Sequence, residues 1–339
     1  MIFNTIIVIL LSILILHYSI IFAKKFKLFD LPNKRKMHKK PIPNIGGLSI
    51  SIVFIISTYF IDFQNNYFNL VLNFSILISF AGFIDDRYTL NVGSKLIWQL
   101  LPISLLIFKF DLIVLDLGNY QIFNQINLGV FSYIFTILCA FLLINATNYM
   151  DGIDGSATIA YLISIFNIII LSNFLNDELL KFYIVICLPL VLFLFYNFNI
   201  FNLSKIFLGD SGSLLLGFIL SFLMIILYKD FNTHPILLAW GVSFIVFEFL
   251  SVNLLRIYLK KSLFQPGQDH VHHLIFYRTN SIFKTNVILI VLNLFIASIG
   301  YFSFYLAGEL FTLISYIISF SLYLFFRLKL IKTKKNKII

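Results

Sequence analysis

The chain has 339 residues, of which 60% are hydrophobic and only 12% are charged, and its mean hydropathy is +0.96. A soluble domain carries about 25% charged residues, so this composition excludes a soluble globular protein and indicates a polytopic membrane protein. The formal charge of +10 could suggest nucleic-acid binding. No basic, aromatic-containing module lies outside the apolar segments, however, so we expect no nucleic-acid partner. Cys139 and Cys187 lie inside apolar runs and predict neither a disulfide nor a metal site.

Apolar runs that could cross a bilayer recur along the whole chain. A spanning helix needs about 20 mostly apolar residues, and its backbone polar groups must be satisfied within the helix. We therefore expect an all-α polytopic membrane protein with about eleven transmembrane helices. Their expected ranges are 2–23, 45–62, 67–84, 94–115, 130–147, 157–175, 180–198, 211–228, 235–257, 285–306 and 309–327.

The two ends of the chain add two expectations. The first apolar run has no basic n-region and no small-residue cleavage site, so it is expected to be an uncleaved anchor. A single transmembrane catalytic domain is expected over 1–328, followed by a basic cytoplasmic tail over 329–339.

Lysine and arginine residues concentrate at alternate connections between these runs. Such residues mark the cytoplasmic ends of membrane spans. The first connection is strongly basic, and placing it in the cytoplasm puts the N-terminus outside and the C-terminus inside. All but three of the 25 cations then lie on the cytoplasmic side, the exceptions being Lys109, Lys181 and Lys229. The positive charge is therefore mainly a signal of topology.

A polar stretch, Asn145-Ala-Thr-Asn-Tyr-Met-Asp-Gly-Ile-Asp-Gly155, lies between two apolar runs. Asn145, Asn148, Asp151 and Asp154 recur every three residues, and over nine residues such a row drifts by about 180° around a helix. One straight helix could not direct all four groups to one point. Glycine is a poor helix former, so we expect the helix to fray at the glycines of this stretch.

Two further acidic motifs carry hard oxygen ligands. Asp85-Asp86 closes the third expected span, where adjacent carboxylates repel each other and are costly to desolvate. The pair is either a solvated helix end or a site that holds Mg²⁺ or a phosphate-bound cation. In Phe207-Leu-Gly-Asp-Ser-Gly-Ser213, the two glycines allow close backbone approach, and Asp210 suits Mg²⁺. Ser211 or Ser213 is expected to cap the following helix. The serine-protease interpretation of this motif is rejected, because no His–Asp pair is placed to activate Ser211.

The motif Asp269-His-Val-His-His273 places three imidazoles within four residues. Zinc is one interpretation, but such close spacing usually requires further ligands nearby. With phosphate chemistry in view, His270, His272 and His273 are expected to bind diphosphate oxygens or to hold a carboxylate. All the unusual motifs, including the stretch from His38 to Gly47, fall on the cytoplasmic side of the expected topology. Carboxylates, cations and histidines on one membrane face suit divalent-metal-assisted phosphoryl transfer.

The order and spacing of these motifs resemble those of the polyprenyl-phosphate N-acetylhexosamine-1-phosphate transferases over essentially the whole chain. The resemblance implies transfer of a sugar 1-phosphate from a UDP-sugar to a polyprenyl phosphate, usually undecaprenyl phosphate, with release of UMP. It also implies Mg²⁺ as cofactor, with Mn²⁺ as an alternative, a site on the cytoplasmic face of the inner membrane, and a homodimer. Such enzymes start cell-envelope polysaccharides such as O-antigen, teichoic acid, enterobacterial common antigen or capsule.

The resemblance also assigns expected roles to individual residues. Asp210 is the expected principal Mg²⁺ ligand, with Asp151 as a second candidate ligand. Asp85 and Asp86 would bind the metal or deprotonate the lipid phosphate, and Asp151 is the candidate base or nucleophile. Asn145 and Asn148 are expected to bind substrate, and Asp154 and Phe207 are expected to lie near the uridine. His270, His272 and His273 would contact the diphosphate or sugar, with His270 as a further catalytic candidate.

Departures from the family pattern leave alternatives open. The enzymes that act on UDP-MurNAc-pentapeptide typically carry three consecutive histidines, whereas Val271 interrupts the run here, which favours the hexosamine branch. An arginine that usually precedes the histidines is missing, and Glu248 replaces an aspartate found in many members. A cation-coupled transporter would need acids near the bilayer midplane and broken helices, and a lipid phosphatase would need an arginine-rich phosphate motif.

Overall fold

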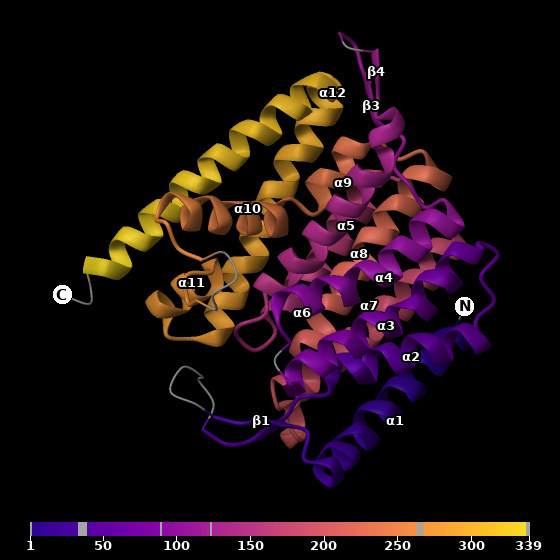
Figure 1. Ribbon diagram of the computed structural model, residues 1–339, viewed down its shortest axis with the longest axis vertical. Coiled ribbons are helices and arrows are strands. Elements are labelled where there is room, and N and C mark those ends of the chain that lie inside the picture. Colours follow the sequence, from indigo (N-terminus) through magenta and orange to yellow (C-terminus); the bar gives the residue numbers. More distant parts are fainter. Residues whose placement is uncertain (1, 33–38, 89, 123, 263–266, 337–339) are drawn as a thin grey trace. The chain divides into compact units, whose positions relative to one another are not determined.

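The computed structural model is built mainly from α-helices, with two short two-stranded sheets (Figure 1). It describes residues 2–32, 39–88, 90–122, 124–262 and 267–336; His38 lies outside these ranges. The described residues form two compact units: unit 1 contains Met1–Phe110 and Leu175–Ile219, and unit 2 contains Asp111–Phe174 and Leu220–Ile339. One helix, α8 (Gly209–Phe231), begins in unit 1 and ends in unit 2.

In unit 1, glycine residues allow neighbouring helices to pack closely against one another. Its helices besides the start of α8 are α1 (Ile2–Phe26), α2 (Gly46–Phe60), α3 (Asn66–Tyr88), α4 (Val92–Phe110) and α7 (Asp177–Asn197), with a 3₁₀ turn at Ile200–Asn202. α2 contacts α1, α3 and α7. A Cβ on Gly47 would overlap the backbone of Gly212, and a Cβ on Gly82 would overlap the backbone of Asp210 and Ser211. α2 and α3 therefore both approach the first turn of α8 at backbone distance.

The chain before α2 holds the loop that leads into α8. Strand β1 (Phe29–Asp30) pairs antiparallel with β2 (Ile42–Pro43), with Phe29 opposite Pro43. The Phe207 amide donates to the Pro43 carbonyl at 2.9 Å, and the Gly46 amide donates back to the Phe207 carbonyl at 3.0 Å. The stretch entering α2 and the stretch entering α8 thus form one hydrogen-bonded layer, which fixes the start of α8 and with it the backbone of Asp210.

Unit 2 is organised by the long helix α12 (Ile282–Asn336), which breaks at Gly308 (φ +82°) into two arms (Figure 1). α12 contacts α6, α9, α10 and α11. Inside the unit, Asn167 donates to the Asn293 side chain at 2.9 Å, which satisfies two buried amides. The other helices are α5 (Ser132–Tyr149), α6 (Ser156–Ser172), α9 (Pro235–Gly241), α10 (Ser243–Tyr258) and α11 (Val271–Thr279), with a 3₁₀ turn at Gly129–Phe131.

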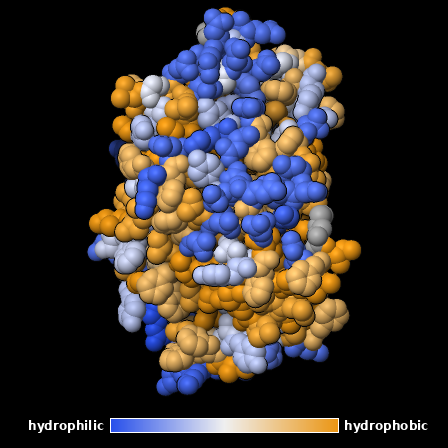
Figure 2. Space-filling model, turned by 90° about the vertical axis from the view of Figure 1, so that its right-hand side faces the viewer, coloured by the Kyte–Doolittle hydropathy of each residue, from blue (hydrophilic) through white to orange (hydrophobic). Residues whose placement is uncertain are grey.

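A hairpin that the sequence did not suggest lies between α4 and α5. Strand β3 (Asp116–Tyr120) pairs antiparallel with β4 (Asn124–Asn127), and Tyr120 lies opposite Asn124. The Tyr228 hydroxyl donates to the Asp116 carboxylate at 2.7 Å and ties the hairpin to α8. Figure 2 shows hydrophilic side chains at the top of the view and also down the middle of this face, with apolar side chains beside and below them.

Each of the eleven apolar ranges expected from the sequence is mainly helical, although 94–115 continues past the end of α4 at Phe110 and 157–175 continues past the end of α6 at Ser172. Among the described residues, seven helices are long and apolar enough to cross a membrane, or up to eight if α9 and α10 count as one span. α2 and α6 are shorter apolar helices, and two of the expected ranges meet inside α12. The protein is therefore an all-α polytopic membrane protein.

The expected span over 235–257 is not one continuous helix, because α9 and α10 are bent by 75°. Val242 leaves the helical region (φ −109°, ψ 6°) between them. Gly241 lies so close to Ile168 of α6 that a Cβ would overlap that side chain. The apolar pattern continues through the break, which is why hydropathy alone does not reveal it.

Gly82→Ala is expected to lower the unfolding temperature of the purified protein. The added methyl group would push α3 away from the first turn of α8, and overpacking of this kind costs about 1–3 kcal/mol. Gly93→Ala is the matched control, because the nearest atom to a Cβ there is the Asn91 side-chain oxygen at 3.5 Å. Thermal unfolding in detergent measures both variants. Equal unfolding temperatures would contradict the tight packing at Gly82.

Candidate functional site

A lysine in unit 1 joins two of the predicted acidic residues. The Lys95 ammonium, near the start of α4, forms an ion pair with Asp85 of α3 and a second one with Asp210 of α8 at 2.7 Å. Asp85 also accepts a hydrogen bond from the Leu90 amide at 2.9 Å, which closes the turn between α3 and α4. The Asp85 side chain is 11% exposed, whereas those of Lys95 and Asp210 are 27% and 30% exposed, so solvent partly screens this charged cluster.

The neighbouring carboxylate, Asp86, caps α8 from another helix. It accepts hydrogen bonds from the Asp210 amide at 3.1 Å and the Ser211 amide at 3.3 Å. These are first-turn amides, which have no partner within their own helix. The prediction that Ser211 or Ser213 caps this helix is wrong: the helix begins at Gly209, and the Ser211 hydroxyl donates to the Leu208 carbonyl instead. A carboxylate from α3 already satisfies the amides that a serine would have capped.

Asn44 supports the same cap from the chain before α2. Its side-chain NH₂ group donates a hydrogen bond to Asp86. Its side-chain oxygen is buried and has no hydrogen-bond partner among the described residues. Gly209 lies against both groups in a left-handed conformation (φ +72°), and a Cβ there would overlap Asn44 and Asp86. The predicted need for a close backbone approach at Gly209 is therefore confirmed.

The oxygen atoms of this cluster fit a hard divalent cation in their chemistry. The candidate donors are the carboxylates of Asp85 and Asp210, which share Lys95. No group of three or more Asp, Glu, His or Cys side chains is arranged to hold a metal within the described part of the chain. Mg²⁺ usually needs only one or two carboxylates, because waters and substrate phosphates complete its coordination. The residues therefore fit a cation that binds together with a phosphate substrate.

In unit 2, the polar stretch after α5 leaves the helix as predicted. α5 ends at Tyr149, so Asn145 and Asn148 lie on its last turns while Asp151 and Asp154 lie in the connection to α6. The Ser156 hydroxyl holds this connection by donating to the carbonyls of Met150 at 2.6 Å and Ile153 at 2.9 Å. The predicted fraying is confirmed, although the helix ends before the first glycine.

The histidine motif lies directly against this connection. A Cβ on Gly152 would overlap ring nitrogens of His272 and His273, so the backbone beside Asp151 touches both imidazoles. The His272 and His273 rings are 4.3 Å apart between centroids, and His270 stacks on His272 at 5.6 Å. The structure thus brings the Asp151 motif and the histidine motif together within one unit.

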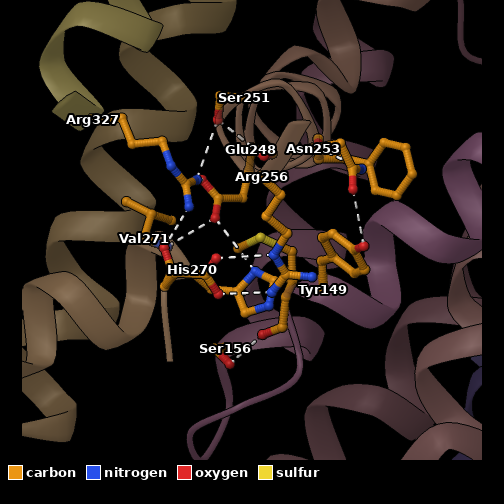
Figure 3. Close-up of polar contacts among 12 residues, drawn as sticks. Tyr149, Ser156, Glu248, Ser251, Asn253, Arg256, His270, Val271 and Arg327 are labelled. Carbon is orange, nitrogen blue, oxygen red and sulfur yellow. Dashed lines mark hydrogen bonds and ion pairs between the residues drawn. The ribbon is translucent and has the colours of Figure 1, made fainter. Parts of the chain in front are cut away.

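An arginine on α10 organises the entry to the histidine motif (Figure 3). Arg256 donates two hydrogen bonds to the Asp269 carboxylate, at 3.0 Å and 2.8 Å. Its guanidinium lies 5.7 Å from the centre of the Tyr149 ring, which packs edge-on against His270 at 4.8 Å. Tyr149 therefore links the end of α5 to both Arg256 and His270.

The electrostatics of this cluster differ from one group to the next. Burial disfavours ionisation of Asp269, but the hydrogen bonds from Arg256 and the nearby positive charge outweigh burial and lower its pKa to about 2. Burial, reinforced by His273 and His270, holds the pKa of His272 well below its usual value. Neither ring nitrogen of His272 has a hydrogen-bond partner among the described residues, and the side chain has no exposed surface. Burial therefore favours the neutral form of His272, and its hydrogen-bonding capacity is unused within the described part of the chain.

Comparison with known proteins places the chain in a family. The model of "Glycosyl transferase family 4" matches residues 68–228. An undecaprenyl-phosphate alpha-N-acetylglucosaminyl 1-phosphate transferase from Thermotoga maritima is 30% identical over 283 residues, which are 83% of each chain. The protein of the same name from Escherichia coli K12 is 27% identical over 323 residues, covering 93% of this chain and 87% of the relative. The chain belongs to glycosyl transferase family 4.

The site residues that the sequence predicted for this family-4 transferase are distributed between the two units. Unit 1 holds Asp85, Asp86, Phe207 and Asp210, and unit 2 holds Asn145, Asn148, Asp151, Asp154, His270, His272 and His273. Asp210 and Asp151, the two predicted metal ligands, therefore belong to different units. The predicted roles of all these residues remain predictions.

Several contributing residues were missed by the sequence reasoning. Lys95 and Arg256 were counted only as cytoplasmic cations, and Asn44 received no role. Asn44 lies within the stretch from His38 to Gly47, and Lys95 follows shortly after the Asp85-Asp86 pair. Closeness in the sequence to a predicted motif was therefore an available signal. Arg256 lies 13 residues before its partner Asp269, across a loop whose course the sequence does not specify.

Lys95→Met is expected to lower the unfolding temperature in the absence of divalent cations. Without the ammonium group, Asp85 and Asp210 lose their shared counter-charge, and removing one member of a buried pair is destabilising. Added Mg²⁺ should raise the unfolding temperature of the variant more than that of the wild type. Lys109→Met, at the exposed end of the same helix, is the control. An identical response of both variants to Mg²⁺ would contradict a cation-dependent cluster.

Asp269→Asn is expected to lower the unfolding temperature by the same amount at pH 5.5 and at pH 8. The pKa of this carboxyl is lowered to about 2, from an ordinary value of about 3.9. A lowered acidic pKa adds stability that is complete above the unfolded value and is lost only as the pH falls toward the folded value. A difference from the wild type that changed between pH 5.5 and 8 would contradict the Arg256–Asp269 pair as the cause.

Proposed function

We propose that this protein transfers a sugar 1-phosphate, that of an N-acetylhexosamine, from a UDP-sugar to undecaprenyl phosphate and releases UMP. The observation that carries this proposal is the match, over 93% of the chain, to a relative named for N-acetylglucosaminyl 1-phosphate transfer to undecaprenyl phosphate. Two clusters of side chains support it. Carboxylates, a lysine and imidazoles suit phosphoryl transfer, and both the charged cluster around Lys95 and the histidine cluster contain residues of the predicted motifs.

In this reaction an oxygen of the lipid phosphate attacks the phosphorus that carries the sugar. A new P–O bond forms to the lipid phosphate while the bond to the UMP phosphate breaks, and UMP leaves with the bonding electrons. Catalysis of such transfers depends on positioning and on stabilisation of negative charge rather than on covalent chemistry. Lys95 provides a positive charge beside Asp85 and Asp210, and we assign it to the phosphate groups.

Mg²⁺ is the proposed cofactor, with Mn²⁺ as an alternative. Asp210 would be its principal ligand, assisted by Asp85; Asp151 remains the second candidate ligand that the sequence indicated. When bound, the ion would neutralise charge on the diphosphate. Asp86 is assigned to holding the α8 N-terminus, and through it Asp210, in addition to the predicted role toward the lipid phosphate.

In unit 2 we assign the imidazoles to the diphosphate or the sugar, and Asp151 to the role of base, because the lipid phosphate is itself the nucleophile in the proposed reaction. The unused hydrogen-bonding capacity of the buried His272 supports this assignment, because leaving buried polar groups unpaired costs free energy unless a ligand or water satisfies them. Contact between Gly152 and the imidazoles supports a joint role with Asp151. Asn145, Asn148, Asp154 and Phe207 are assigned to the nucleotide.

The finer features of topology and assembly are also proposals. They comprise eleven spans, an outer N-terminus, a cytoplasmic C-terminus and site, location in the inner membrane, one catalytic domain over 1–328, and a homodimer. The distribution of lysine and arginine supports the orientation. Participation in O-antigen or other cell-envelope polysaccharide synthesis follows from the class of product.

The alternative functions receive less support. A UDP-MurNAc-pentapeptide donor is disfavoured by the interrupted histidine run. The bend between α9 and α10 is the kind of feature that transporters use to bind ions, but residues 234–243 contain no acidic side chain. The nearest acid along α10, Glu248, is paired with Arg327.

Purified protein with undecaprenyl phosphate, Mg²⁺ and a panel of UDP-sugars is expected to release UMP and to form a lipid-linked diphosphate sugar, with UDP-N-acetylglucosamine tested first. Mass spectrometry of the lipid and quantification of UMP measure the reaction. Asp210→Ala and EDTA should each abolish it, because the proposed cation site depends on that carboxylate. Asp62→Ala, in the connection between α2 and α3, is the control. A folded wild type that gives no product with any donor would refute the proposal.

A further inference from the structure

A fully buried acid on α10 has four partners in unit 2 (Figure 3). The Glu248 carboxylate accepts hydrogen bonds from the Val271 amide at 2.9 Å and the Tyr323 hydroxyl at 2.8 Å. It also forms an ion pair with Arg327 and lies 3.6 Å from Nδ1 of His270. An isolated carboxylate could not remain buried, so these partners are what allow it to stay charged inside the protein.

Arg327, from the second arm of α12, provides the counter-charge and makes two further contacts. Its side chain is 1% exposed, and it donates to Ser251 at 3.2 Å and to the backbone carbonyl of Asp269. Arg327 therefore binds both α10 and Asp269, the residue immediately before His270. A residue 57 positions after His270 along the chain thus fixes the backbone from which the histidine motif begins.

These contacts determine the orientation of His270. His270 is the N-cap residue of α11, but its side chain makes no capping hydrogen bond. Instead of the His270 side chain, the Glu248 carboxylate accepts the hydrogen bond from the first amide of the helix, that of Val271. The imidazole is thereby released from capping, and its buried Nδ1 lies 3.6 Å from the Glu248 carboxylate, within ion-pair distance but without a hydrogen bond among the described residues. Because the two nitrogens lie on different sides of the ring, Nε2 is directed away from Glu248.

We propose that Glu248, held by Arg327, is a positioning residue that fixes the orientation and the Nδ1-protonated form of His270 so that Nε2 serves the substrate. This inference rests on the proposed function for the identity of the substrate, but the geometry it requires can be tested without substrate. Carboxylate–histidine pairs fix ring orientation and tautomer in this way at other sites, and loss of the partner typically costs about 10–100-fold in activity.

The test compares four variants. Glu248→Gln removes the charge, and Glu248→Asp keeps it. The double variant Glu248→Met/Arg327→Met replaces the buried pair with apolar side chains, which often preserves folding. Tyr323→Phe is the matched control, since it removes one hydrogen bond to Glu248 and leaves the carboxylate. Thermal unfolding establishes that each variant is folded before its activity is compared.

With UDP-N-acetylglucosamine and undecaprenyl phosphate, Glu248→Gln and the double variant are expected to lose kcat by about 10–100-fold. KM for the UDP-sugar should change by less than about threefold, because His270 is assigned to the reacting diphosphate. Glu248→Asp and Tyr323→Phe should retain kcat within about threefold. In a His270→Gln background, Glu248→Gln should cause no further loss, because its effect acts through His270.

A second measurement needs no substrate. In protein labelled with ¹⁵N-histidine, the long-range ¹H–¹⁵N spectrum should show His270 as the Nδ1-protonated form in the wild type and as a mixture in the double variant. His270→Gln assigns the resonances. A folded double variant with wild-type kcat, additive losses in the His270→Gln background, or an unchanged His270 spectrum would overturn the proposal. Absence of transferase activity in the wild type with the expected spectra would instead refute only the proposed function.

Discussion

In each unit, a carboxylate from one helix holds the first amides of another helix that carries a functional motif. Asp86 of α3 accepts from the amides of Asp210 and Ser211 at the start of α8. Glu248 of α10 accepts from the Val271 amide at the start of α11. The first four amides of a helix lack internal partners, and a negative charge there is favourable. These two interactions set the positions of Asp210 and His270, on which the proposed chemistry depends.

Such caps require that the capping carboxylates be stabilised in turn. Glu248 is balanced by Arg327, and the guanidinium also binds the Asp269 carbonyl, so one ion pair orders two elements. Asp86 receives a hydrogen bond from Asn44, which belongs to the layer that pairs with the Phe207 stretch. Each cap therefore joins three segments that are distant in the sequence. Loss of one member would expose the others as unpaired buried charges or amides.

The sequence predicted the parts of the protein that depend on local composition. Apolar ranges of sufficient length became helices, and the glycine-containing stretch after Asn148 left the helix as its composition indicated. Where a helix ends near two glycines depends on the helix propensity of nearby residues, which is a local property of the sequence. The bend at Val242 was not predictable, because it depends on close packing of Gly241 against Ile168 on another helix. Hydropathy does not distinguish a straight span from a bent one.

The candidate site was predictable in its motifs and not in their connections. Lys95 was interpreted as a cation at a membrane boundary, and its contact with Asp210, 115 residues away, has no sequence signal. Arg327 was interpreted as part of the basic end of the chain for the same reason, although it is buried against Glu248. Long, charged side chains at span ends satisfy the topology rule whether they face water or an acid.

Adjacent carboxylates and closely spaced histidines serve different partners because helix geometry separates them. Neighbouring residues on a helix point about 100° apart. Asp85 can therefore face Lys95, and through it Asp210, while Asp86 caps the backbone of the same helix that carries Asp210. In the histidine motif, His270 precedes α11 and faces Glu248, whereas His272 lies inside the helix and is buried against Gly152. Neighbouring members of a doublet or triplet of like residues thus have different partners, and substitutions at neighbouring positions are expected to have distinct effects.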